Sequence, residues 1–353
     1  MSTSAVVTGS GSAFPGDVLQ EALWEGFFAR HFADVRVAQR IFVSSGVRRR
    51  HTVADPRDED VSGWSTGARM ERYMAEALPL GKSAVAAALD DAGLAPQDIG
   101  LFTVASCTGY ATPGIDIRLA SGLGMADTVQ RLFVGHMGCY AALPALGTAA
   151  DFVVARRRPA VVLCLELTSL HIQPPTTDLQ QVVVHALFSD AAAAVVLEPG
   201  APGLAVVDVA ARTDAATADH MTWDVTDLGF RMGLSPRVPD VLAVHVRPMV
   251  DDLLARNGVR ADEVDGWAVH PGGPRILDVV ADRLGLADDA LDASRAVLAE
   301  HGNCSSATIL LVLARMGTPA PGRYVVALAF GPGLTLYGAL LQQRAQGCSS
   351  AAR

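Results

Sequence analysis

Three polar residues of this chain, Cys139, His270 and Asn303, have types and settings that suit nucleophilic chemistry. Cys139 follows Gly138 at an expected strand-to-helix turn, and the free N–H groups and positive dipole of a helix N-terminus favour a thiolate. His270 follows an apolar strand and precedes a Pro-Gly-Gly-Pro loop, where α/β sheets place groups that face a ligand. A thiol for attack, an imidazole to hold charge and a carboxamide to donate to an oxyanion or enolate would form one catalytic set.

Taken singly, each of these residues also has a structural interpretation. The chain has five cysteines, with no Cys-x-x-Cys spacing and no histidine pair at metal spacing, so we expect no metal site. The other four are Cys107, Cys164, Cys304 and Cys348. A cysteine is most often a small buried packing residue, and an isolated histidine is most often a surface or capping residue.

A weak internal repeat connects Cys139 with Asn303. Residues 89–105 resemble residues 254–270, because each segment has a helix end closed by glycine, an acidic turn and an apolar strand. At nearly the same offset, residues 138–142 align with residues 302–306, which gives Cys139 and Asn303 equivalent positions. In a pseudosymmetric pair, equivalent helix starts can face each other, so the two residues would share one site.

The alternation of short β-branched runs with Ala/Leu-rich stretches predicts a layered α/β fold with mostly buried strands. The expected strands cover residues 101–105, 160–165, 204–207, 267–269 and 324–329. Together with the repeat, this predicts two similar halves. Residues 1–202 would carry the nucleophile, and residues 203–353 would carry the histidine and asparagine.

Composition excludes several classes of function. The chain has 353 residues, 50% of them hydrophobic, and a net charge of -9, which argues against nucleic-acid binding. Lys82 is the only lysine and lies in a helix-like run, so a Schiff-base mechanism is disfavoured. The apolar runs, such as 160–167, are too short to span a bilayer, and residues 1–12 lack the features of a signal peptide. We therefore expect a cytoplasmic protein without membrane contact.

Four short motifs of the chain are specific enough to compare with known families: His270-Pro-Gly-Gly-Pro274, Gly302-Asn-Cys-Ser-Ser306, Ala329-Phe-Gly-Pro-Gly-Leu-Thr335 and Ala186-Leu-Phe-Ser-Asp190. Together they resemble the chalcone-synthase-like type III polyketide synthases of the thiolase superfamily, in their bacterial form. The resemblance runs from about Thr8 to Leu341. It implies a thiolase-like duplicated αβαβα layered sandwich, a homodimer, and a reaction between acyl-CoA and malonyl-CoA that needs no cofactor.

The resemblance also implies roles for individual residues. Cys139 would be acylated by a starter acyl-CoA and hold the growing chain, while His270 and Asn303 would decarboxylate malonyl-CoA and stabilise the enolate. Phe188 and Phe230 would match the aromatics between the CoA tunnel and the elongation cavity. The remaining residues that would bind substrate are Cys107, Thr168, His171, Ser305, Gly331, Pro332 and Gly333, with Arg48 and Arg275 near the CoA entrance.

Several interpretations stay open on sequence grounds. Arg48 suits a phosphate contact and a solvated basic turn about equally. His171 is unusual for this family and would add a titratable group to the cavity. A ketoacyl-ACP-synthase-III-like enzyme that accepts a carrier protein is one alternative function, and a non-catalytic thiolase-fold partner is another. The starter, the number of extensions and the mode of cyclisation are not determined by the motifs.

Overall fold

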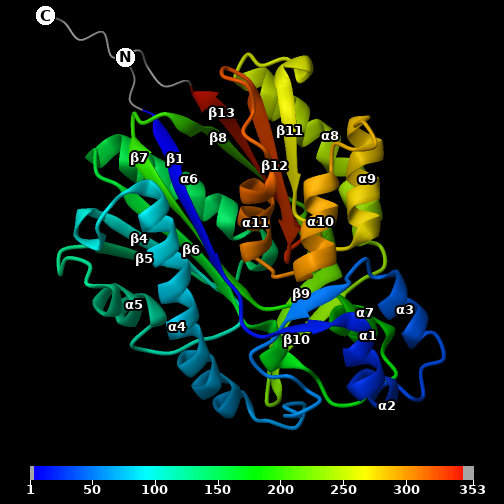
Figure 1. Cartoon of the computed structure of the whole chain (residues 1–353). Helices are drawn as coiled ribbons and strands as arrows, with labels where there is room; N and C mark the ends of the chain where they lie inside the picture. The colour runs from blue at the N-terminus through cyan, green and yellow to red at the C-terminus, as the bar shows by residue number, and fades with distance from the viewer. Residues whose placement is uncertain (1–3, 345–353) are drawn as a thin grey trace, which may run out of the picture.

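A nine-stranded mixed sheet forms the framework of the computed structural model, which describes residues 4–344 (Figure 1). In spatial order its strands are β11 (Val264–Val269), β12 (Tyr324–Gly331), β13 (Thr335–Arg344), β8 (Gly203–Thr213), β1 (Ala5–Ala13), β7 (Ala191–Pro199), β6 (Ala160–Glu166), β4 (Leu101–Ala105) and β5 (Gln130–Val134). All five strands expected from the sequence are present, so the predicted α/β pattern is confirmed.

The strand pairings repeat on either side of the β1–β8 junction. In the first half β4 runs parallel to β6, and β6 then pairs antiparallel with β7. In the second half β11 runs parallel to β12, and β12 then pairs antiparallel with β13. The two halves of the sheet are joined by only two strand residue pairs, Val6 with Ala205 and Val7 with Leu204. This pattern confirms the duplicated fold that the internal repeat predicted.

Helices cover the sheet in layers, and alternate residues of each strand face different layers. The outer layer on the first half contains α4 (Thr66–Ala92) and α5 (Ile115–Leu123), and the outer layer on the second half contains α8 (Val238–Arg256) and α9 (Pro274–Leu284). Between the halves lie α6 (Ala142–Arg156) and α11 (Ala307–Arg315). On β6, for example, Leu163 packs in the outer core and Val162 in the central one.

A smaller layer closes one end of the sandwich over the central helices. The N-terminal elements lie beside α7 at this end in Figure 1, and α3 packs directly on α7. The N-terminal elements are α1 (Gln20–Leu23), a π-helical turn η1 (Trp24–Phe28), α2 (Ala29–His31), α3 (Ala38–Ser44) and the strand pair β2 (Asp17–Leu19)–β3 (Arg49–His51). The layer also contains α7 (Leu179–Leu187) and the strand pair β9 (Met221–Thr226)–β10 (Gly229–Leu234). The other helical elements are η2 (Pro96–Asp98), η3 (Gly138–Tyr140), η4 (Thr168–His171), η5 (Ala215–His220), η6 (Ala261–Glu263) and α10 (Asp292–His301).

Within the described residues, one helical stretch is long and apolar enough to cross a membrane by length and composition alone. It is Gly138–Arg156, which comprises η3 and α6, and 61% of its apolar window is buried inside the protein. The stretch packs between the two halves of the sheet. Its apolar character is therefore that of a central core helix.

Candidate active site

Cys139 lies in the turn η3, directly before α6, as the sequence predicted. Gly138 makes this turn possible because its φ of 68° lies in the left-handed region, which favours glycine. A Cβ at Gly138 would also lie only 2.8 Å from Cδ of Pro332, so the second half of the chain approaches the turn closely. Cys139 is therefore held at the start of the central helix by a contact from the other half.

His270 follows the last residue of β11 and begins the loop that leads into α9. Its backbone N–H donates to the carbonyl of Leu328 on the neighbouring strand β12, at 2.8 Å. The ring is 1% exposed, and among the described residues neither Nδ1 nor Nε2 has a hydrogen-bond partner. Two unpaired ring nitrogens in a buried position are expensive, and they are available to a substrate or to a proton from another group.

Asn303 follows α10 and is fixed by its backbone on both sides of Phe188. Its N–H donates to the carbonyl of Leu187 at 2.8 Å, and its carbonyl accepts from the N–H of Ser189 at 3.0 Å. The side-chain Oδ1 accepts from the N–H of Ser305 at 2.9 Å. Because Oδ1 is engaged as an acceptor, the Nδ2 group is the part of the amide left to donate to a ligand.

The structure brings these three residues to one pocket of about 450 Å³, which we call the entrance pocket. Its walls come from α3, α7, α8 and the start of α9, and most of them are apolar. Cys139, His270 and Asn303 line it from two halves of the chain, with Phe188 among them. The arrangement can support nucleophilic attack by sulfur and stabilisation of a developing negative charge in the same space.

Burial favours the neutral forms of the two titratable groups. It raises the pKa of the Cys139 thiol to about 12, although a hydrogen bond with the Ser305 hydroxyl acts in the opposite direction. It lowers the pKa of His270 to about 3. Burial therefore favours the thiol form of Cys139 and the neutral imidazole of His270.

A buried carboxylate that the sequence analysis did not identify lies behind the nucleophile. Glu166 accepts hydrogen bonds from the N–H of Cys107 at 3.0 Å, the hydroxyl of Thr108 at 2.8 Å and the hydroxyl of Ser306 at 2.5 Å. Burial raises the pKa of Glu166, and its charge raises that of Cys139. The signal in the sequence that could have identified Glu166 is its place as an acidic residue at the end of the otherwise apolar strand β6.

Cys107 and Ser305 lie between this carboxylate and Cys139. They line a second space of about 20 Å³, the nucleophile pocket, together with Cys139, Thr168 and Pro332. The Cys107 sulfur is 3.5 Å from both Glu166 carboxylate oxygens and 3.5 Å from Oγ of Ser305. Burial and the Glu166 charge raise the pKa of Cys107 well above its ordinary value, so this thiol is a hydrogen-bond donor rather than a second thiolate.

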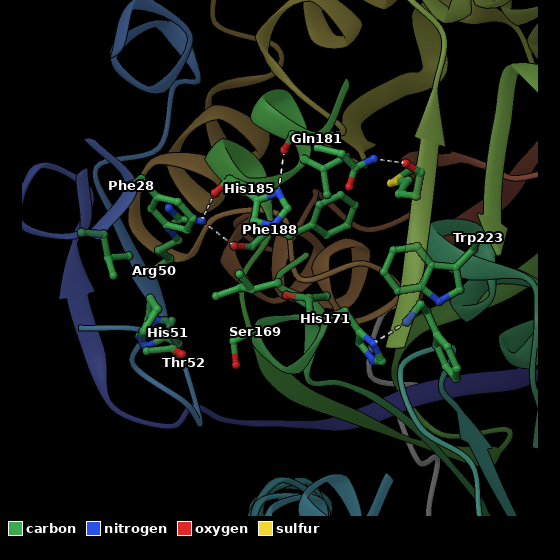
Figure 2. A pocket seen from close by; sticks show the side chains of 17 residues that line it. Phe28, Arg50, His51, Thr52, Ser169, His171, Gln181, His185, Phe188 and Trp223 are labelled. Carbon is green, nitrogen blue, oxygen red and sulfur yellow. Dashed lines mark hydrogen bonds between the residues drawn. The ribbon is translucent and has the colours of Figure 1, made fainter. Parts of the chain in front are cut away.

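A third space of about 50 Å³, the inner pocket, shares Phe188 with the other two pockets, and Figure 2 shows the side chains that line it. Phe230, His171 and Thr168 line it, whereas the entrance pocket has none of these three. Figure 2 shows Phe188 between Arg50 and His185 on one side and His171 and Trp223 on the other. Phe188 and the flexible Met232 line all three pockets, so Met232 rather than Phe230 stands with Phe188 at their junction.

His171 is fully hydrogen-bonded. Its Nε2–H donates to the carbonyl of Thr108 at 2.7 Å, and its Nδ1 accepts from the N–H of Phe230 at 2.9 Å, which fixes one neutral tautomer. The ring also stacks on Phe230, with centroids 4.6 Å apart. Burial lowers the pKa of His171 to about 4, so it carries no charge at neutral pH.

The loop and entrance residues implied by the resemblance differ in their positions. Gly331 packs against Tyr140, the residue after Cys139, because a Cβ at Gly331 would lie 2.7 Å from the Tyr140 ring. Gly333 has a φ of 98°. Arg275 lines the entrance pocket, and its guanidinium Nη2 lies 3.7 Å from the carboxylate Oδ1 of Asp240. Arg48 is exposed and lines none of the three pockets.

The comparisons with known proteins point to one family. Residues 2–201 match the N-terminal domain, and residues 208–344 the C-terminal domain, of chalcone and stilbene synthases. The chain is 37% identical over 313 residues to a 1,3,6,8-tetrahydroxynaphthalene synthase of Streptomyces peucetius subsp. caesius, covering 85% of this chain and 82% of that protein. It is 32% identical over 358 residues to an alpha-pyrone synthesis polyketide synthase-like protein of Mycobacterium tuberculosis, covering 96% and 91%.

Solved structures agree with these relatives. The crystal structure of 1,3,6,8-tetrahydroxynaphthalene synthase from Streptomyces coelicolor superimposes with a TM-score of 0.91 at 29% identity, covering 96% of this chain and 99% of that one. A polyketide synthase from the brown alga Ectocarpus siliculosus gives a TM-score of 0.91 at 29% identity, covering 97% and 99%.

Proposed function

Because the chain belongs to the chalcone and stilbene synthase family and is a type III polyketide synthase, we propose that Cys139, His270 and Asn303 carry out its reaction. The observation that supports this most is that the three residues line one pocket although they come from both halves of the chain. Cys139, His270 and Asn303 are far apart in the sequence, and the duplicated fold is what brings them to one pocket.

In the loading step, the Cys139 sulfur attacks the thioester carbonyl of a starter acyl-CoA. The thiol proton passes to a ring nitrogen of His270, both of which are free of protein partners, and then to the departing CoA thiolate. The new carbon–sulfur bond leaves the acyl group on Cys139 and restores neutral His270. Burial lowers the pKa of His270, but the negative charge that develops on the Cys139 sulfur favours the protonated imidazole while the proton is held there.

In the extension step, malonyl-CoA loses carbon dioxide, and the electron pair of the broken bond becomes an enolate on the thioester. The Nδ2 group of Asn303 and a ring N–H of His270 would donate to this enolate oxygen. The enolate carbon attacks the acyl group on Cys139, and the sulfur leaves as a thiolate, which takes a proton from solvent. The lengthened chain is then on CoA and can reload Cys139, and the final chain cyclises.

The remaining expectations are part of the same proposal. The division into residues 1–202 and 203–353, the use of acyl-CoA and malonyl-CoA without a cofactor, and a cytoplasmic location fit this enzyme class. A homodimer is supported by exposed apolar side chains at the edge of the sheet: Phe133 lies on the edge strand β5, and Ile117 lies on α5, which packs against β5.

The test is incubation of the purified protein with malonyl-CoA and a panel of acyl-CoA starters, followed by measurement of carbon dioxide release and mass spectrometry of products. We expect both signals without any carrier protein. A requirement for acyl carrier protein would favour the ketoacyl-synthase alternative. Absence of both signals, with Cys139 alkylated no faster than Cys164, would favour a non-catalytic partner.

A further inference from the structure

The space available around Cys139 is divided unequally by Phe188. The entrance pocket has about 450 Å³, whereas the nucleophile pocket has about 20 Å³ and the inner pocket about 50 Å³. A water-sized group needs about 10–15 Å³ of such space. The nucleophile pocket therefore accommodates roughly one non-hydrogen atom with its hydrogens, and the inner pocket about four.

This division limits the acyl chain because the two substrates must be bound at once. In the proposed reaction, each extension brings the thioester end of a new malonyl-CoA to His270 and Asn303, and these two line the entrance pocket alone. Cys139 lines both the entrance pocket and the nucleophile pocket. With the incoming malonyl-CoA in the entrance pocket, the space left for the chain on Cys139 is the nucleophile pocket and, next to it, the inner pocket, which share Thr168, Phe188, Trp223 and Met232.

Trp223 borders both of these small spaces, as do Thr168, Phe188 and Met232. Its indole Nε1–H donates to the carbonyl of Cys107 at 2.7 Å, which fixes the ring next to the nucleophile pocket. The ring also contacts other aromatic groups, with centroids 5.6 Å from His171, 6.1 Å from Phe230 and 6.5 Å from Phe188. Rotation of Trp223 would break the hydrogen bond and disturb this aromatic cluster.

The neighbour of Trp223 on the inner side is equally fixed. His171 has hydrogen bonds at both ring nitrogens and stacks on Phe230. Met232 is the one unbranched, flexible side chain at the junction of the three pockets, and it can move to admit a slightly longer chain. We therefore expect the Met232 side chain to move when a slightly longer chain is bound, and the Trp223 ring to keep its position.

From this geometry, and resting on the proposed function, we propose that the enzyme uses short acyl starters of about two to four carbons, adds at most about two malonyl-derived units, and has Trp223 as the residue that sets this limit. An acetyl group extended once has about as many non-hydrogen atoms as the two small pockets hold. A second –CH2–CO– unit requires movement of Met232, and a third has no space.

The experiment compares the product sizes of the wild-type enzyme and Trp223→Ala by mass spectrometry, with malonyl-CoA and acetyl-, butyryl-, octanoyl- or palmitoyl-CoA. For the wild type we expect products no longer than the starter plus two units, and a kcat/KM at least tenfold lower with octanoyl-CoA than with butyryl-CoA. For Trp223→Ala we expect the longest product to gain one unit or more, and the octanoyl penalty to fall at least threefold.

Two further variants control this comparison. Trp223→Phe keeps a ring but loses the hydrogen bond to Cys107, so we expect the wild-type longest product with a minor longer one. Trp267→Phe, on β11 and lining none of the three pockets, should leave the distribution unchanged. If Trp223→Ala does not fold, Trp223→Leu serves the same purpose with a smaller expected gain.

The outcomes separate this inference from the proposed function. Wild-type enzyme that makes a ten-carbon naphthalene, or prefers palmitoyl-CoA, would overturn the size limit while leaving the catalytic proposal intact. A folded Trp223→Ala with the wild-type product distribution would remove Trp223 as its cause. Failure of the wild type to release carbon dioxide with every starter would instead contradict the proposed function.

Discussion

The turn that presents Cys139 and the turn that presents Asn303 are the equivalent parts of a duplicated fold, and they differ in what they contribute. Each begins with a glycine in the left-handed region, Gly138 with a φ of 68° and Gly302 with a φ of 71°. A Cβ at Gly138 would lie 2.8 Å from Pro332 of the second half, and a Cβ at Gly302 would lie 2.8 Å from Cβ of Ser189 of the first. Each half therefore holds the catalytic turn of the other in place.

The difference between the turns is chemical. The first half offers a thiol at the start of α6, and the second offers an amide whose backbone is bonded on both sides of Phe188. The aligned strands β4 and β11 differ too, because β4 ends with Ala105 at the position that aligns with His270. The two halves thus share a backbone frame and differ in the side chains that they present to the pocket.

The largest expected effect comes from removing the thiol. Cys139→Ala should abolish polyketide formation but keep malonyl-CoA decarboxylation, since His270 and Asn303 remain. Cys304→Ala is the matched control, because Cys304 is a buried cysteine directly after Asn303 in the equivalent turn. We expect it to keep activity within about threefold, as the loss of one buried sulfur is a packing change. Product from Cys139→Ala, measured by mass spectrometry, would contradict the central assignment.

The second effect concerns the decarboxylating pair. His270→Ala and Asn303→Ala should each lower the rate of carbon dioxide release by about 10²–10³, the usual cost of losing one oxyanion donor. Asn257→Ala, after the end of α8 and away from the pockets, is the control and should release carbon dioxide at the wild-type rate. If either active-site variant releases carbon dioxide at the wild-type rate, the substituted residue does not belong to the decarboxylating pair.

A third prediction tests the reciprocal packing of the two turns. Gly138→Ala and Gly302→Ala should each destabilise the protein by more than Gly93→Ala. Gly93 shares their positive φ, at 68°, but has nothing within 4 Å of an added Cβ. At Gly302 the ψ of -169° adds backbone strain that is absent at Gly93, where ψ is 28°. Strain alone costs about 1–2 kcal/mol, and the contacts at Gly138 and Gly302 add to it. Equal losses of unfolding free energy in all three variants, measured in urea, would show that the contacts are not rigid.

The smallest expected effect is on the pH dependence of the unfolding free energy, and it concerns one buried histidine from each half, His171 and His270. Burial lowers the pKa of His171 to about 4 and that of His270 to about 3, so each stays neutral in the fold while the unfolded chain gains a proton below about pH 6.5. Their contribution to stability is present above pH 6.5 and is lost as pH falls toward 4 and 3. His171→Gln should reduce the slope of unfolding free energy between pH 6 and pH 5 by about 1.4 kcal/mol per unit. An unchanged slope in urea titrations would show that His171 does not remain neutral.

Much of the candidate site and of its framework could be predicted from the sequence. Cys139, His270 and Asn303 were proposed from residue type, turn glycines, the internal repeat and the resemblance to a known family, because helix caps and strand ends leave local signals. The duplicated layered fold followed from the same repeat and from the alternation of apolar runs. The expected helix ends at Gly93 and Gly258 also agree with the structure, where both glycines have a positive φ.

The tertiary structure alone decided the size and charge of the cavity. Trp223 and Met232 come from a hairpin distant in sequence from Cys139, and no local pattern places them against Phe188. The neutral state of His171, the buried carboxylate of Glu166 and the exposed position of Arg48 likewise depend on what packs around each group. Cys348 lies outside the described residues. Periodicity and caps are local properties of a chain, whereas pocket volume and desolvation are set by contacts between distant segments.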